Sequence, residues 1–247
     1  ATVVCGHALR LDWNELLPAG RCSYVVGNRQ FVGGEYQTKE QPDDMKLVWA
    51  GVKGAGLLDY VTAWYAKAAG YLKGDPARPK DRPGRAALVS TNSITQGEQV
   101  GVVLNELFRR GITIDFGHRT FPWTSEAKGK AHVHVVIVGF GHGDGPDTKR
   151  VYEYDATGEP LGVTAVGNVS PYLRDGANQG LENRRMPIVP VPAIGVGNKP
   201  IDGGYYLFNT QERDAFVRDE PGSAVFFRRW LGSKEMLHDI ERWVLWL

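Results

Sequence analysis

The residues best suited to chemistry form the segment Gly27-Asn28-Arg29-Gln30-Phe31, which follows the apolar pair Val25-Val26. An asparagine amide at the end of a strand can accept a hydrogen bond from the exocyclic amine of a nucleobase, and a nearby ring can stack on that base. Asn28 and Phe31 are therefore candidates for holding a base. A plain strand-to-loop turn explains the same five residues, and both interpretations stay open.

A second group of candidates lies between residues 117 and 130, which we expect to form a long loop between two strands. Aromatic side chains alternate there with cations, a mixture suited to stacking on bases and neutralising phosphates. Long ordered loops are usually functional. The group comprises Arg119, Phe121, Trp123, Lys128 and Lys130. Rings folded back over the edge of a sheet would explain the aromatic residues equally well.

Three histidines raise the possibility of a metal site. His132 and His134 are alternate residues of an expected strand and so share one face, with His142 nearby in the sequence. No cluster of carboxylates or cysteines completes a ligand set. Ordinary histidines of a sheet are the favoured interpretation, so we expect no metal. The chain also lacks the glycine-rich phosphate loop, the dinucleotide fingerprint and the nucleophile elbow of hydrolases.

The elements that position these residues follow from hydrophobic periodicity. The pattern predicts helices over 57–72 and 96–110 and strands near 25–28 and over 86–90, 112–116 and 131–140. A loop is expected over 32–46. The order of strands and helices indicates an α/β sheet whose last two strands form a hairpin.

The regular alternation of helix and strand patterns ends after about residue 145. Short segments such as Arg150–Tyr154 alternate with Gly, Pro and Asn turns, which places a domain boundary near residue 148. Residues 223–247 look helical and end in the apolar run 243–247. A chain that stops on such a run is expected to have been cut from a longer one.

Composition excludes several classes of protein. The 247 residues include 29 Lys and Arg against 28 Asp and Glu, 42% hydrophobic and 23% charged residues, as in globular proteins. No apolar run approaches the length of a membrane span, and the N-terminal segment does not resemble a signal peptide. Two cysteines, Cys5 and Cys22, suit a reducing compartment, and we expect a cytoplasmic location. The net charge of +1 neither requires nor excludes nucleic acid.

Taken together, several segments resemble one family in its own order along essentially the whole chain. They are CGHALRLDW, VVGNRQFVGG, DYVTAWYAKAAGYL, ALVSTNSITQGEQV, LFRRGITIDFGHRTFPWTSEAKGKAHVHVVIVGF, SPYL, GNKPIDGG and RWVLWL. The chain resembles the MmeI-like adenine-specific DNA methyltransferases of type II restriction-modification systems. The stretch from Ala87 to Phe140 is the most specific part of this resemblance.

The resemblance implies the later part of a class I, Rossmann-like methyltransferase sheet that ends in a β-hairpin. Residues 1–148 would be the C-terminal part of the catalytic domain, and residues 149–247 the start of an irregular α+β target recognition region. The implied reaction transfers a methyl group from S-adenosyl-L-methionine to N6 of an adenine flipped out of double-stranded DNA. The implied partners are that DNA and the remainder of a longer polypeptide, with no membrane.

The resemblance also assigns roles to individual residues. Asn28 would accept the hydrogen bonds of the adenine amine, and Phe31 would stack on the base. The opposing platform would be Phe121 or Trp123. The other implied contacts are to DNA through Arg119, Lys128 and Lys130, and to the cofactor through His7 and Ala8.

Two departures from the family pattern matter. Arg29-Gln30 stands where the family has Pro-Pro, which relaxes the backbone that aims the carbonyl after Asn28. The family's cofactor glycine loop lies upstream of the segment that matches residues 4–7, so we expect a fragment. The main alternative is a catalytically impaired DNA-binding module of the same family. A metal-dependent hydrolase built on His132, His134 and His142 is the remote alternative.

Overall fold

The computed structural model divides the chain into two compact units, residues Ala1–Arg185 and Met186–Leu247. Each is described by itself. The structure describes residues 2–73, 84–123, 133–143, 145–182, 184, 186–191 and 202–246. Among these residues, no helix combines the length and the apolar character that crossing a membrane requires.

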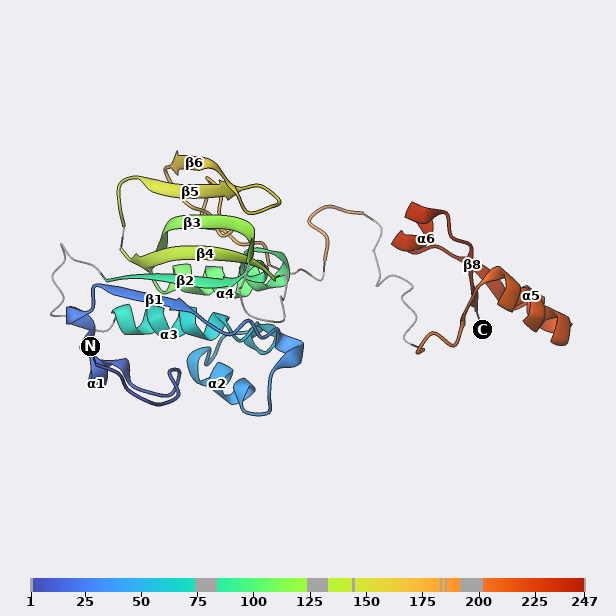
Figure 1. Cartoon of the computed structure of the whole chain (residues 1–247), viewed down its shortest axis with the longest axis horizontal. Coiled ribbons are helices and arrows are strands. Elements are labelled where there is room, and N and C mark those ends of the chain that lie inside the picture. The colour runs from blue at the N-terminus through green and yellow to red at the C-terminus, as the bar shows by residue number, and fades with distance from the viewer. Residues whose placement is uncertain are drawn as a thin grey trace. The chain divides into compact units, whose positions relative to one another are not determined.

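The first unit is built on a six-stranded sheet in the order β1-β2-β4-β3-β5-β6 (Figure 1). Its strands are β1 Tyr24–Asn28, β2 Arg85–Thr91, β3 Ile112–Trp123, β4 Val133–His142, β5 Lys149–Tyr154 and β6 Pro160–Val166. Its helices are α1 Trp13–Leu16, α2 Gln41–Val48, α3 Thr62–Lys73 and α4 Gly97–Arg109. The expected α/β class is confirmed, and β3 and β4 form the expected antiparallel hairpin.

Strand directions decide which residues share an edge of this sheet. β1 runs parallel to β2, and β4 is antiparallel to both β2 and β3. The strands β1, β2 and β3 therefore run the same way and end at one edge. That carboxyl edge carries the residues that follow β1, the residues that follow β2, and the end of β3.

Helices α3 and α4 bury their apolar faces against one face of the sheet. In α4, Val100, Val103, Leu104 and Leu107 recur at three- and four-residue spacing and are all buried. In α3, the ring of Tyr65 stacks on Phe140 of β4, and its hydroxyl hydrogen-bonds to the Leu88 carbonyl and to Ser90 Oγ. Such contacts fix the helices over the strands whose ends form the edge.

Three sequence expectations need correction in this unit. The helix expected from Leu57 begins at Thr62, because Leu57 belongs to a short 3-10 turn and Leu58 has an extended backbone. The expected loop over 32–46 includes the start of helix α2. The strand expected to end at Phe116 continues to Trp123, so Arg119, Phe121 and Trp123 lie on β3 and not in a loop.

The first sheet also continues past the boundary expected near residue 148. Strand β5 pairs in parallel with β3, and β6 pairs with β5. Contacts between residues therefore divide the chain after Arg185. A boundary of function near residue 148 stays a prediction.

The second unit contains a small sheet in the order β7-β9-β8. Its elements are β7 Leu207–Phe208, α5 Thr210–Asp219, β8 Phe227–Trp230, α6 Ser233–His238 and β9 Arg242–Leu245. The expectation of a helix over 223–247 was wrong for most of that stretch. The C-terminal apolar run enters β9 because its backbone pairs with β7 and β8 on both sides.

Candidate active site at the carboxyl edge of the sheet

Asn28 is the last residue of β1 and pairs with Val89 of β2. The side chain is exposed at the carboxyl edge. Within the described residues, its amide has no hydrogen-bond partner. The amide oxygen is therefore available to accept a hydrogen bond from a ligand at this edge.

The two residues that replace the family's prolines are exposed, but Arg29 turns back toward helix α3. Its guanidinium lies 6.0 Å from the centroid of the Trp64 ring, a cation–π distance. Phe31 differs from Arg29 and Gln30 because it is half-buried and packs against the core. The structure thus anchors Phe31 and leaves Gln30 in solvent.

Asp59 fixes the loop that follows Asn28 to the end of strand β2. One carboxylate oxygen accepts from the backbone N–H of Gly34 at 3.1 Å. The other accepts from Thr91 Oγ1 at 3.3 Å and from Ser93 Oγ at 2.5 Å. Two segments of the carboxyl edge therefore share one carboxylate, a link that sequence reasoning missed. The expected helix start at Leu57 hid it, because Asp59 lies before the helix.

The end of β3 carries the rings expected to form the opposing platform. Phe121 lies 4.7 Å from Tyr154 and 6.4 Å from Trp123, measured between ring centroids. All three side chains are half-buried. Three strand spacings of about 4.8 Å separate β1 from β3, or roughly 14 Å across the edge. Asn28 and these rings therefore share an edge without forming one packed cluster on the strands.

The expected cations do not form one group. Arg119 is ion-paired with Glu153 of β5, which neutralises it in the folded chain. Lys128 and Lys130 lie outside the described residues. Their expected contact with DNA stays a prediction.

His118 links β3 to the tyrosines of β5. Its ring stacks on Tyr152 at 4.2 Å, and its Nδ1 lies 2.5 Å from the Tyr154 hydroxyl. Burial lowers the pKa of His118, so the neutral ring is favoured. Burial also raises the pKa of Tyr154, and Tyr152 adds to that effect. These neutral rings pack the last part of β3 against β5.

His7 and Ala8, the expected cofactor contacts, lie beside a buried carboxylate. His7 Nε2 is 3.5 Å from Asp44 and 3.4 Å from the Tyr60 hydroxyl. The Tyr60 backbone N–H in turn donates to the carbonyl of Val32, in the loop after Asn28. The Ala8 carbonyl accepts from the Trp13 indole at 2.8 Å and is already engaged.

The histidines do not gather into a metal centre in the part of the chain described. His134 and His142 lie eight residues apart on β4, roughly 27 Å along an extended strand. His142 Nε2 is 2.8 Å from the carbonyl oxygen of Ala69. His132 lies outside the described residues. The distance along β4 contradicts a hydrolase site shared by His134 and His142.

Comparison with known proteins agrees with this fold. Residues 1–153 match the family described as MmeI, DNA-methyltransferase domain, and residues 175–247 match MmeI, target recognition domain. A solved structure of the type IIL restriction-modification enzyme MmeI in complex with DNA is 45% identical, with a TM-score of 0.89. The match covers 99% of this chain and 32% of that one. DNA methyltransferase A of Bacillus subtilis (strain 168) is 39% identical over 98% of this chain and 26% of its own length.

The fold and these matches define a class, that of DNA methyltransferases with an attached target recognition domain. Within that class, the chain belongs to the MmeI family. It spans about a third of the solved relative and about a quarter of the curated one. The family resemblance read from the sequence is confirmed.

Proposed function

We propose that this chain supplies the base-binding side of a DNA methyltransferase that modifies N6 of adenine in a restriction-modification system. The observation that carries the proposal is the amide of Asn28 at the carboxyl edge of the sheet, which has no partner among the described residues. The match to the methyltransferase domain supports methyl transfer, and the DNA-bound relative supports duplex DNA as the substrate. A DNA-modifying enzyme of this kind would work in the cytoplasm.

The reaction needs a base held in one orientation while charge develops on its amine. The lone pair of adenine N6 is delocalised into the ring, so the neutral amine is a weak nucleophile. The Asn28 oxygen would accept one amino hydrogen, and the backbone carbonyl of the next residue, Arg29, would accept the second. Phe31, anchored in the core, would present its ring to the base. Positioning of this kind lowers the barrier without a general base of unusual pKa.

S-adenosyl-L-methionine is the methyl donor that such a reaction requires, and it would supply an electrophilic methyl group. In this chain, we propose only His7 and Ala8 as residues beside that cofactor. His7 is half exposed and presents its ring, although Asp44 and Tyr60 lie beside its Nε2. Ala8 would contribute its methyl group alone, since Trp13 takes its carbonyl. His7 and Ala8 would therefore border the cofactor, and the main cofactor loop would come from outside this chain.

The division of labour along the chain is also a proposal. The sheet up to about residue 148 would carry the catalytic role, and the region from 149 onward would contact the bases of the target. The match of residues 175–247 to a target recognition domain supports this assignment.

Arg29-Gln30 favours a second candidate function, a DNA-binding module with impaired catalysis. The observation behind it is that Arg29 folds back over Trp64, where prolines would hold the backbone extended. In the complete encoded polypeptide that contains this chain, Arg29→Pro/Gln30→Pro should raise methyl transfer to DNA by about tenfold or more. Unchanged methylation would show that our interpretation of this turn is wrong.

The direct test of the main proposal is the chemical identity of the product. Tritiated S-adenosyl-L-methionine and duplex DNA of mixed sequence are incubated with the complete encoded polypeptide, and the DNA is digested to nucleosides. The expected labelled product is N6-methyladenine. Label on cytosine would overturn the adenine assignment.

A further inference from the structure

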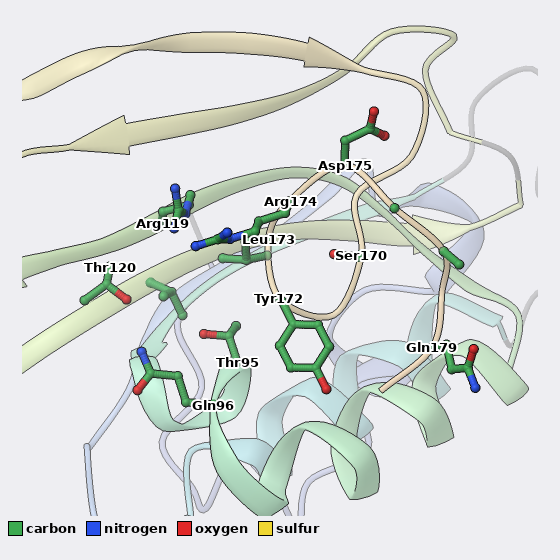
Figure 2. Close-up of a pocket in the computed structure, with 13 residues that line it drawn as sticks. Thr95, Gln96, Arg119, Thr120, Ser170, Tyr172, Leu173, Arg174, Asp175 and Gln179 are labelled. Carbon is green, nitrogen blue, oxygen red and sulfur yellow. The ribbon is translucent and has the colours of Figure 1, made fainter. Parts of the chain in front are cut away.

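A cavity of about 620 Å³ opens on the first unit beside the ends of β2 and β3. Figure 2 shows its walls, which come mainly from three segments of the chain, with Val136 of β4 as a fourth contribution. Thr95 and Gln96 lie before α4, Arg119 and Thr120 lie on β3, and the third wall is a loop that we call the cavity loop, residues 168–180. The volume falls in the range of about 300–1,000 Å³ that is usual for ligand sites.

The cavity loop is built as a rigid wall. Asn168 Nδ2 donates to the Gly176 carbonyl at 2.7 Å and thereby closes the loop on itself. Asn105 of α4 accepts from the Gly180 N–H at 2.7 Å and donates back to its carbonyl at 3.1 Å. Two side-chain amides thus tie the loop together and fasten its end to the helix.

Leu173 pins the centre of the cavity loop to the sheet. It is buried, and its backbone has a φ of 50°, a left-handed conformation that leucine rarely adopts. It packs so closely on Gly117 of β3 that a Cβ there would lie 2.7 Å from Leu173 Cδ2. A strained residue held by such packing is typical of a preorganised binding surface.

Five polar side chains of the cavity have no partners among the described residues. Among the described residues, no hydrogen bond or ion pair engages the side chains of Gln96, Thr120, Ser170, Arg174 or Gln179. Ser170 is only 7% exposed and lines the cavity. A ligand could therefore form hydrogen bonds to these side chains without breaking bonds that they already make among the described residues.

The charges of the cavity favour an anion. Figure 2 shows the side chain of Arg174 extending toward Arg119 and Thr120, while the carboxylate of Asp175 points away from both arginines. Glu153 neutralises Arg119, which leaves the Arg174 guanidinium as the unpaired cation on this wall within the described residues. A guanidinium without a carboxylate partner is well suited to a phosphate.

Glutamine side chains at the cavity suit the edge of a base. Gln96 and Gln179 both line the cavity, and glutamine is a residue that recognises base edges by paired hydrogen bonds. The cavity is lined by residues of β3 and β4, in the same sheet as the strand β1 that carries Asn28. The match to the target recognition domain also begins within the cavity loop, at residue 175.

We propose that the cavity binds one nucleotide of DNA, a neighbour of the base that is methylated, with its phosphate at Arg174 and its base edge at Gln96 and Gln179. This inference rests on the proposed function, because it places the nucleotide next to the base held at Asn28. The cavity loop would then hold the DNA strand beside the base that is methylated.

The test is the salt dependence of binding to a short fluorescent duplex of mixed sequence, measured by anisotropy with residues 1–247. Arg174→Ala should weaken binding by about tenfold. It should also reduce the slope of log K against log salt by about one, because one phosphate contact is lost. Arg174→Lys should keep the slope. The matched control is Arg21→Ala, an exposed arginine before β1 at the opposite edge of the sheet, which should change neither quantity.

The base-edge half of the proposal has its own variant. Gln179→Ala should weaken binding without changing the salt slope, because no charge is removed. Binding by Arg174→Ala that equals the unchanged chain in affinity and slope would overturn the cavity proposal while leaving the proposed function intact. No binding of the duplex by the unchanged chain at low salt would overturn both.

Discussion

At the scale of single residues, side chains that are available to a ligand differ from side chains that hold others in place. We propose that Asn28 is of the first kind, since its amide has no partner in the described chain. Asp44 belongs to the second. Its carboxylate is only 2% exposed and accepts from Arg10 Nε and from the Tyr60 hydroxyl, both at 2.7 Å. A buried acid so well satisfied is a structural element of the His7 region.

Asp44 should therefore make stability depend on pH. Burial alone would raise the pKa of Asp44, but hydrogen bonds from Tyr60 and Arg10 outweigh it, and the pKa lies below its ordinary value. Stability from this group is fully present above the ordinary Asp pKa of about 3.9 and is lost as the pH falls through the lower folded value. Asp44→Asn should cost about 2 kcal/mol in urea unfolding at neutral pH.

The neighbouring Asp43 is the matched control. Its side chain is 72% exposed and pairs only with Lys46, so Asp43→Asn should change stability by less than about 0.5 kcal/mol. Equal losses from the two substitutions would contradict the role given to Asp44.

His118 predicts a second dependence on pH, of the same sign but in a higher window. Because its folded pKa is lowered, the unfolded chain takes up a proton near the ordinary value of about 6.5 while the folded chain does not. Stability from this group is fully present above the ordinary His pKa of about 6.5 and should fall as the pH drops through that value toward the lower folded pKa. His118→Phe should flatten that profile, and His134→Phe, at an exposed position, should not. A profile unchanged in His118→Phe would refute the assignment.

At the residue scale, the sequence leads to the prediction of Asn28 and Phe31, but it could not indicate Asp59. The first two carry a local signal, an amide and a ring at the end of an apolar run. Asp59 acts through partners 25 and 34 residues away, Gly34 and Ser93. No local pattern records which distant hydroxyl or N–H a carboxylate will meet.

At the scale of elements, the site depends on how segments are fastened to one another. The side chain of Asp59 holds the loop after Asn28 to the end of β2. The backbone N–H of Asp59 donates to the side-chain amide oxygen of Gln99, in α4, at 3.1 Å. Helix α4, strand β2 and the loop are thus joined at a single residue.

Removing the carboxylate should therefore loosen the loop. In Asp59→Ala the Gly34 N–H loses its acceptor, a change of roughly 1.5–3 kcal/mol for a bond to a charged group. Hydrogen exchange of peptides that cover residues 31–36 should become at least about tenfold faster. Asp155→Ala, in the turn between β5 and β6, is the control and should leave that exchange unchanged. Equal exchange rates in both variants would show that the Asp59 carboxylate does not hold this loop.

Elements were predictable where burial is periodic and local. The buried positions of α4 and the apolar run of β2 were both expected from the sequence and are confirmed. The length of β3 was not predictable, since it depends on partners in β4 and β5 that lie far along the chain. Strand β9 was mistaken for helix for the same reason, because pairing on both sides overrides the local pattern.

At the scale of the whole molecule, one chain joins a sheet that matches a methyltransferase domain to a unit that matches a target recognition domain. The family could be read from the sequence because many short motifs occur in the family's order over the whole length. The replacement of the paired prolines by Arg29-Gln30 is the feature that the family pattern does not explain.

The measurement that tests this account most directly is methyl transfer to duplex DNA by the complete encoded polypeptide carrying Arg29→Pro/Gln30→Pro, with Asn28 intact or replaced. We expect Asn28→Ala to reduce transfer by at least about 100-fold, as loss of a transition-state hydrogen bond does. Asn28→Asp, which keeps an acceptor oxygen, should retain more activity than Asn28→Ala. Methyl transfer that survives Asn28→Ala undiminished would contradict the central claim that the end of β1 holds the reacting base.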